Sequence, residues 1–121
     1  MHTSRIELRI AEVLSDSQLV LNAGENHGIQ KGDEFIVYGL SNNEIIDPAT
    51  QRSLGKLELY RGTGQIIYVQ DTMSIIQALP SASFARVSAA ISGTTTATFD
   101  NATRGDYVKP NATLVSPQQQ N

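Results

Sequence analysis

His27 and Glu25, which lie two residues apart in a polar loop, are residue types that could begin a metal site. Zinc takes imidazole and carboxylate ligands, but even a catalytic zinc site needs three ligands from the protein. The chain has 2 histidines and no cysteine, so only His2 could add a second imidazole. We therefore interpret His27 as a histidine on a loop surface, and we expect no metal and no other cofactor.

Two aspartates, Asp33 and Asp106, are the candidates for an acid–base pair, since paired carboxylates can donate and accept a proton. Each directly follows a glycine and precedes a β-rich run, where aspartate commonly caps a turn by accepting a backbone N–H. Turn capping is the favoured interpretation of both. The run Gly62-Thr63-Gly64 could belong to a phosphate loop, but no Lys-Ser/Thr pair follows it. A bend within a strand is favoured there.

The serines of the chain do not form a Gly-x-Ser-x-Gly elbow, and no nucleophile is paired with a base. We therefore expect that the protein is not an enzyme. An alternative function is a ligand-binding barrel that holds an oligosaccharide or a nucleotide on an aromatic face. A deep pocket lined by Tyr60 and Tyr68, with polar groups converging on it, would favour that alternative.

Composition excludes several classes of partner. The chain has 121 residues, with 9 Lys and Arg against 12 Asp and Glu, and an isoelectric point near 5.2. Nucleic-acid binding depends on clustered cations, and here the cations are scattered, so we expect no nucleic-acid partner. No apolar run approaches the roughly 20 residues that span a bilayer, so we expect no direct membrane insertion.

The cysteine content and the N-terminal residues are compatible with two localisations. A lack of cysteine excludes disulfides but is compatible with either a reducing or an oxidising compartment. Met1 leads within a few residues into a β-like run, without the pattern of a signal peptide. We expect either a cytoplasmic protein or a processed domain excised from a secreted precursor.

Apolar and polar residues alternate with period two along much of the chain, which is typical of strands with one buried face. Ile6, Leu8 and Ile10 share a face, and the break at Ala11-Glu12 predicts a β-bulge. Further strands are expected over residues 18–22, 34–40, 56–70 and 73–79, with a closing strand from residue 107. We therefore expect an all-β fold, a small partly closed β-barrel of about six strands.

Glycine, aspartate and proline mark the corners between these strands, because they supply positive φ, a side-chain cap and a fixed φ, respectively. The predicted structural turn residues are Gly24, Gly28, Gly32, Asp33, Asp47, Pro48, Gly55, Gly64, Gly105 and Asp106. Residues 39–55 are expected to be a long connection. It contains a hairpin over residues 45–54, folded back on the barrel as a lid.

We expect one domain over residues 1–115, with a Ser/Thr/Ala-rich insertion at 80–103 and a disordered tail at 116–121. Within the insertion, Phe84, Val87 and Ile91 have helical spacing and predict a short helix over residues 83–92. The β-branched residues that follow predict a strand over residues 94–99.

Two turn elements occur in order along the chain. The first contains Asn22-Ala23-Gly24, Gly28-Ile29 and Gly32-Asp33, and the second is Asp47-Pro48-Ala49-Thr50-Gln51-Arg52-Ser53-Leu54-Gly55. Together with Gly64-Gln65-Ile66, Ser74-Ile75-Ile76 and Gly105-Asp106-Tyr107-Val108, they make most of residues 5–109 resemble the C-terminal β-barrel domain of flagellar assembly protein T and its relatives. Gln51 stands where that family usually carries Gly.

This resemblance implies an assembly module of the bacterial envelope or of an appendage, and it supplies no catalytic residues. We therefore expect a non-catalytic protein-interaction module, with a protein partner or self-association. Exposed aliphatic side chains on a hairpin are typical of a partner surface. The interface is predicted at Ile45, Ile46, Leu54 and Tyr60, with the loop over residues 25–31 beside it.

Overall fold

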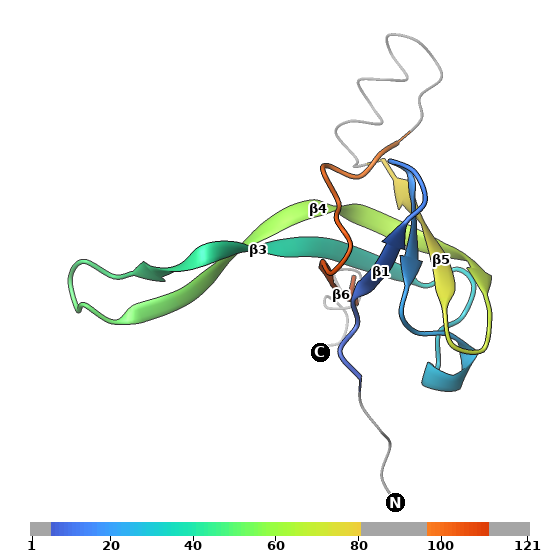
Figure 1. Cartoon of the computed structure of the whole chain (residues 1–121), viewed down its shortest axis with the longest axis horizontal. Coiled ribbons are helices and arrows are strands. Elements are labelled where there is room, and N and C mark those ends of the chain that lie inside the picture. The colour runs from blue at the N-terminus through green and yellow to red at the C-terminus, as the bar shows by residue number, and fades with distance from the viewer. Residues whose placement is uncertain (1–5, 81–96, 112–121) are drawn as a thin grey trace, which may run out of the picture.

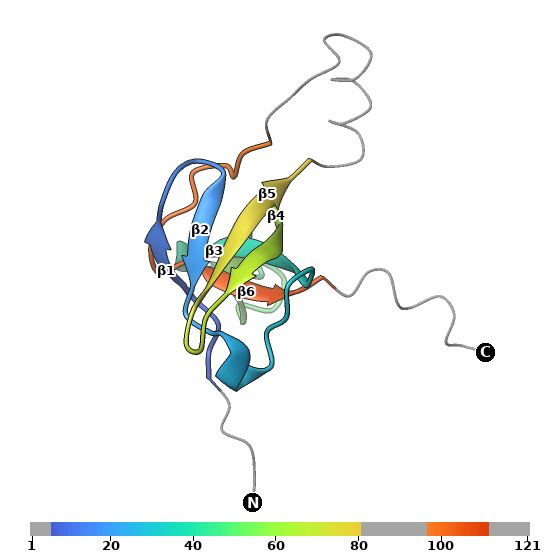
Figure 2. The same cartoon turned by 90° about the vertical axis from the view of Figure 1, so that its right-hand side faces the viewer.

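The alternating segments form six strands of one antiparallel sheet in the computed structural model, which describes residues 6–80 and 97–111. The strands are β1 (Ile10–Val13), β2 (Gln18–Leu21), β3 (Glu34–Ile46), β4 (Ser53–Val69), β5 (Ser74–Leu79) and β6 (Tyr107–Pro110). Their order in the sheet is β1-β2-β5-β4-β3-β6, and Figures 1 and 2 show the sheet curling on itself. The helical part of the described residues is the single turn η1 (Glu25–His27).

The two edge strands of this sheet, β1 and β6, approach each other where the barrel partly closes. Arg9 and Tyr107 form an isolated antiparallel bridge. Next to it, the Ile10 N–H donates to the Asp106 carbonyl at 2.8 Å, and the Gly105 N–H donates to the Ile10 carbonyl at 2.7 Å. The edges therefore meet over a short stretch without forming a full ladder, which confirms the expected all-β, partly closed barrel of about six strands.

The inner face of the sheet forms the hydrophobic core. Its most deeply buried side chains come from five strands and are at most 1% exposed: Ile10, Leu19, Leu21, Val37, Ile66 and Ile76. The predicted bulge in the first strand is present as a register shift between Ile10 and Glu12. Within the barrel, β2, β5 and the first half of β3 bury one residue in two, which is the result that the period-two pattern predicts.

Phe99 completes the core from outside the sheet. The expected strand over residues 94–99 is wrong for its described part, because residues 97–99 lie in no strand. The Phe99 N–H donates to Asp16 and the Asp100 N–H donates to Arg61, so the segment is bonded to two different elements instead of along one ladder. A Cβ at Gly64 would lie 2.9 Å from the Phe99 ring, so this glycine makes room for the side chain.

The hairpin formed by β3 and β4 is longer than predicted and points away from the barrel (Figure 1). Most of the connection expected over residues 39–55 is strand, since β3 extends to Ile46 and β4 begins at Ser53. The lid expectation is wrong. Strand β6 pairs with β3 only up to Tyr38, and β5 pairs with β4 only from Thr63 onwards, so the outer half of the hairpin has no neighbouring strand among the described residues.

The predicted helix over residues 83–92 and the predicted tail over residues 116–121 lie outside the described residues, as does most of the insertion at 80–103. Within residues 6–80 and 97–111, no helix has the length and apolar character needed to cross a bilayer.

Gly24 and Gly28 test two different reasons for glycine in the connection from β2 to β3. A Cβ on Gly24 would lie 2.1 Å from the Gln70 carbonyl oxygen, a backbone atom that η1 also uses as an acceptor. Gly28 has φ of 83°, and a Cβ there would meet no atom within 4 Å. Gly24→Ala should therefore reduce the free energy of unfolding by about 3 kcal/mol through overpacking, and Gly28→Ala by about 1 kcal/mol through backbone strain.

Urea unfolding followed by circular dichroism measures both values. Equal losses in the two variants would contradict the close approach of Gly24 to the β4–β5 turn.

Candidate interaction surface

The outer half of the β3–β4 hairpin exposes aliphatic side chains to solvent. Ile45 is 44% exposed, Ile46 49%, Leu57 55% and Leu54 66%. A pair of strands with no third neighbour is marginally stable in water, because it has little apolar surface to bury. The projecting ribbon, with its four exposed aliphatic residues, is therefore a surface that a partner could cover.

The aliphatic residues occupy both faces of this ribbon. Ile45 pairs with Gly55, and Leu57 is two residues from Gly55, so Ile45 and Leu57 fall on the same face. Ile46 pairs with Ser53 and falls on the other face. Leu54 is the extra residue of the register shift between these two pairs. A partner could therefore bury apolar surface on either side of the ribbon.

The tip of the hairpin has the turn chemistry that the sequence predicts. The Asp47 carboxylate accepts the Ala49 N–H at 2.8 Å, and the Asp47 carbonyl accepts the Gln51 N–H at 2.7 Å. Gln51 has φ of 64°, so the backbone keeps the left-handed conformation at the position where the resembled family carries Gly. Gly55 follows with φ of 93°. The tip is thus a defined turn that fixes the register of the ribbon.

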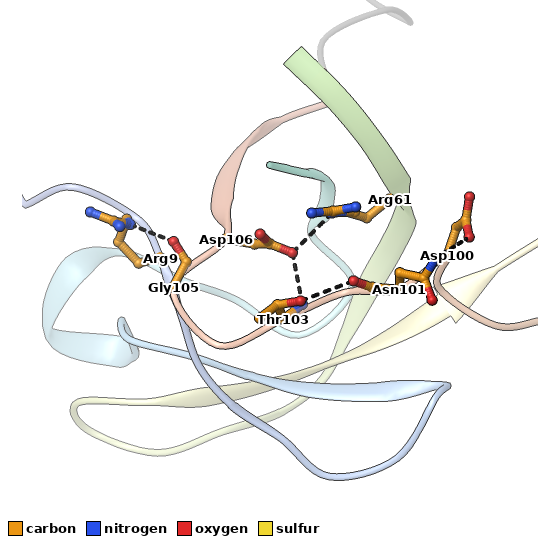
Figure 3. A network of polar contacts seen from close by, with 7 residues as sticks. All are labelled: Arg9, Arg61, Asp100, Asn101, Thr103, Gly105 and Asp106. Carbon is orange, nitrogen blue, oxygen red and sulfur yellow. Dashed lines mark hydrogen bonds and ion pairs between the residues drawn. The ribbon is translucent and has the colours of Figure 1, made fainter. Parts of the chain in front are cut away.

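A polar network fastens the root of the hairpin to the barrel (Figure 3). Arg61 of β4 forms an ion pair with Asp106, the Nε–Oδ2 distance being 3.2 Å, and the Asp106 side chain is 9% exposed. The same carboxylate oxygen accepts the Thr103 N–H at 2.8 Å. A Cβ at Gly39 would lie 2.6 Å from the Arg61 guanidinium, so β3 passes directly beside the pair. Asp106 is therefore more than a turn cap, because it ties β4 to the segment before β6.

A row of three tyrosines crosses the outer face next to this root. Tyr38 pairs with Tyr60 on β4 and with Tyr107 on β6, and the Tyr38 and Tyr107 rings stack at 5.6 Å. Arg9 lies 4.0 Å from the Tyr107 centroid, and the Lys109 ammonium lies 4.9 Å from the Tyr38 centroid. Such cation–π contacts hold the Tyr107 end and the middle of the row.

Lys109 also forms an ion pair with Glu58 at 2.8 Å. The hydrogen bond to Glu58 raises the pKa of the exposed Lys109 above its ordinary value. Lys109 is therefore charged at neutral pH, and it loses this charge as the pH rises through its raised pKa.

Tyr60 is exposed, as predicted, and its hydroxyl lies 2.8 Å from the Thr63 hydroxyl. Tyr60 lines a hollow of about 260 Å³ with Leu79 and Pro80, whereas Tyr68 lines a groove of about 520 Å³ beside residues 28–31. The two tyrosines thus belong to separate hollows, and they do not form the joint pocket that the ligand-binding alternative requires.

The loop over residues 25–31 is not beside the hairpin, which corrects the predicted position. The Gly32 N–H donates to Ile66 and the Glu25 N–H donates to Gln70, so the loop packs at the opposite end of β4 from the hairpin tip. Asp33 caps its turn as expected, accepting the Gln30 N–H at 2.9 Å. His27 is exposed, and the described residues contain no group of three or more His, Cys, Asp or Glu that could hold a metal ion.

No protein-family model and no curated protein matches this chain. The functional inference therefore rests on the residues described above.

Sequence reasoning missed two residues of this surface. Leu57 is not among the predicted interface residues, yet it is exposed, because the ribbon extends beyond its neighbouring strands. Arg61 lay beside the predicted bend without an assigned role. A lone arginine next to Gly62-Thr63-Gly64 carries no sequence signal for a partner 45 residues later, so its pairing with Asp106 depends on the fold.

Removing the Asp106 carboxylate tests the root network. Asp106→Ala would leave the Arg61 charge and the Thr103 N–H without their shared acceptor, and we expect a loss of about 3 kcal/mol in the free energy of unfolding. The matched control is Glu7→Ala, which removes the exposed ion pair between Glu7 and Arg9 and should leave the unfolding midpoint almost unchanged. Similar midpoints for the two variants in urea would show that the Arg61–Asp106 pair does not stabilise the root.

Proposed function

We propose that this protein is a non-catalytic protein-interaction module that binds through its projecting β3–β4 hairpin. The observation that carries the proposal is the exposure of Ile45, Ile46, Leu54 and Leu57 on a ribbon without neighbouring strands in the described part of the chain. A partner that covers this ribbon would bury apolar surface at about 25 cal/mol per Å² and would give the two strands the packing they lack.

The construction of the hairpin supports this role. Its tip is held by Asp47 and its root by the Arg61–Asp106 pair. A ribbon fixed at both ends loses less conformational entropy on binding than a flexible loop does, so more of the contact energy contributes to affinity.

The polar groups that could have served catalysis support a non-catalytic role, because they have structural partners. The Asp33 carboxylate accepts the Gln30 N–H, and the Asp106 carboxylate is shared by Arg61 and the Thr103 N–H. The resemblance to the C-terminal domain of flagellar assembly protein T favours a narrower proposal, an assembly module of the bacterial envelope or an appendage.

Polar replacement on the hairpin tests the proposed function. Ile46→Thr combined with Leu54→Gln should abolish capture of the partner from an extract of the source organism, because both side chains are exposed and form the contact. Quantitative mass spectrometry of proteins retained by the immobilised full chain is the measurement. Unfolding midpoints of the variant and the parent chain should agree.

Tyr68→Ser provides the matched control, since Tyr68 is 52% exposed on a different part of the surface. It should retain whatever the parent chain retains. If the hairpin variant unfolds, or if it keeps the same partners as the parent, the hairpin is not the binding surface.

A further inference from the structure

The side of β4 that faces away from β3 is an open sheet edge along the hairpin. Strand β5 covers this edge only from Thr63 onwards, and the Asp100 N–H occupies the Arg61 carbonyl at 2.7 Å. From Gly55 to Tyr60 the edge has no strand beside it among residues 6–80 and 97–111. An uncovered edge presents backbone N–H and C=O groups that can pair with another strand.

The opposite edge of the ribbon is less suitable for pairing. On β3, three residues (Ser41, Asn42 and Asn43) stand against Leu57 alone, which produces a register shift between Leu40 and Glu44. Such a bulge interrupts the row of backbone groups and protects an edge. On β4 the two residues without a partner on β3 are Leu54 and Arg61, one at each of the other register shifts. The six residues between them therefore form a stretch of β4 without a bulge of its own.

We propose that a second copy of this chain pairs with this edge, so that two β4 strands lie antiparallel about a two-fold axis at Leu57. The inference deepens the proposed function and rests on it, because it names the partner of the hairpin. In this register Leu57 faces Leu57 of the second copy, and Gly55 faces Leu59. The contact is isologous and therefore closes as a dimer.

Charge complementarity selects both the occupant and the register. The sequence Lys56-Leu57-Glu58 is self-complementary when read antiparallel about Leu57, because each Lys56 then stands opposite a Glu58, twice per dimer. An axis at Lys56 or at Glu58 would place like charges directly opposite each other, which destabilises a sheet. Glu58 keeps a second carboxylate oxygen for this contact, since Oε1 accepts from Lys109.

The backbone geometry is consistent with the same register. The Leu57 N–H donates to the Ser41 hydroxyl on β3 at 2.9 Å, so the backbone groups of Leu57 point towards β3. Because successive residues of a strand alternate, those of Lys56 and Glu58 point to the open edge. The two Lys56–Glu58 pairs would thus be hydrogen-bonded, and Leu57–Leu57 would be the close pair between them.

The dimer would partly bury the apolar side chains that the ribbon exposes, because they would gain cross-strand neighbours from the second copy. Two ribbons would become one four-stranded sheet with Ile45, Leu57 and Leu59 of each copy on one face, by register and alternation. Continued in the same register, Leu54 of the second copy would lie opposite Tyr60, which lines the hollow with Leu79 and Pro80. A four-stranded sheet has the stability that an isolated two-stranded ribbon lacks.

A single introduced cysteine tests the axis directly, because the natural chain contains none. In Leu57→Cys the two Cα atoms would lie about 4.5 Å apart, the spacing of a close antiparallel pair, which allows a disulfide. The control is Thr50→Cys at the exposed hairpin tip, since the two tips lie at opposite ends of the dimer. Mild oxidation followed by non-reducing electrophoresis should link Leu57→Cys and not Thr50→Cys. Equal linking, or none, would overturn the proposal.

Charge variants test the register, and a mixture of two variants controls for misfolding of either one. Lys56→Glu and Glu58→Lys should each raise the dissociation constant of the dimer about tenfold or more in sedimentation equilibrium, because each homodimer would contain like charges opposite each other. Mixing the two variants should restore association, since the mixed pair has only opposite charges at these positions. Weakening in both variants without restoration on mixing would contradict the register.

The oligomeric state and the capture experiment together distinguish failure of the dimer from failure of the proposed function. A chain that remains monomeric at all concentrations, but whose hairpin variant loses a captured protein, would overturn self-association and support a different partner for the hairpin. A chain that dimerises with no link at residue 57 would place the second copy elsewhere.

Discussion

The structure depends on a difference in length between neighbouring strands. Strands β3 and β4 have 13 and 17 residues, whereas the strands beside them, β6 and β5, have 4 and 6. Six short strands suffice to enclose the core, so the remaining length of β3 and β4 cannot join the barrel. It extends as a ribbon whose backbone edges and aliphatic side chains are left to solvent. The exposed surface is thus a direct result of sheet geometry and is independent of any binding site inside the barrel.

A projecting ribbon can hold a binding surface in a fixed position only if its root is rigid. The root combines Phe99 packed on Gly62 and Gly64 with the Arg61–Asp106 pair beside Gly39. Each glycine here removes a Cβ that would collide with the side chain next to it. The core and the ion pair therefore act together on the few residues where the barrel ends and the ribbon begins. Residues 97–106, the described segment before β6, contribute to both, although they contain no strand.

Much of the barrel could be predicted from the sequence, because a half-buried strand produces a period-two pattern that is local. The bulge after Ile10, the burial of Leu19 and Leu21, and the Asp47 turn all follow from neighbouring residues. The direction of the hairpin could not be predicted in this way. Whether Ile45 and Leu54 fold onto the barrel depends on where β5 and β6 stop, which is information from distant parts of the chain. The same holds for the Arg61–Asp106 pair.

Charged residues on an edge strand commonly prevent unwanted pairing, since an arriving strand would bring an unmatched charge. The alternation Lys56-Leu57-Glu58 has a different consequence. It opposes strands that place an acidic residue against Glu58 or a basic residue against Lys56, yet it offers a matched partner to its own sequence in the register centred on Leu57. The same two charges thus act against many partners and in favour of one. Selectivity on a short edge can therefore come from the order of charges along the strand, while the aliphatic residues supply apolar contacts.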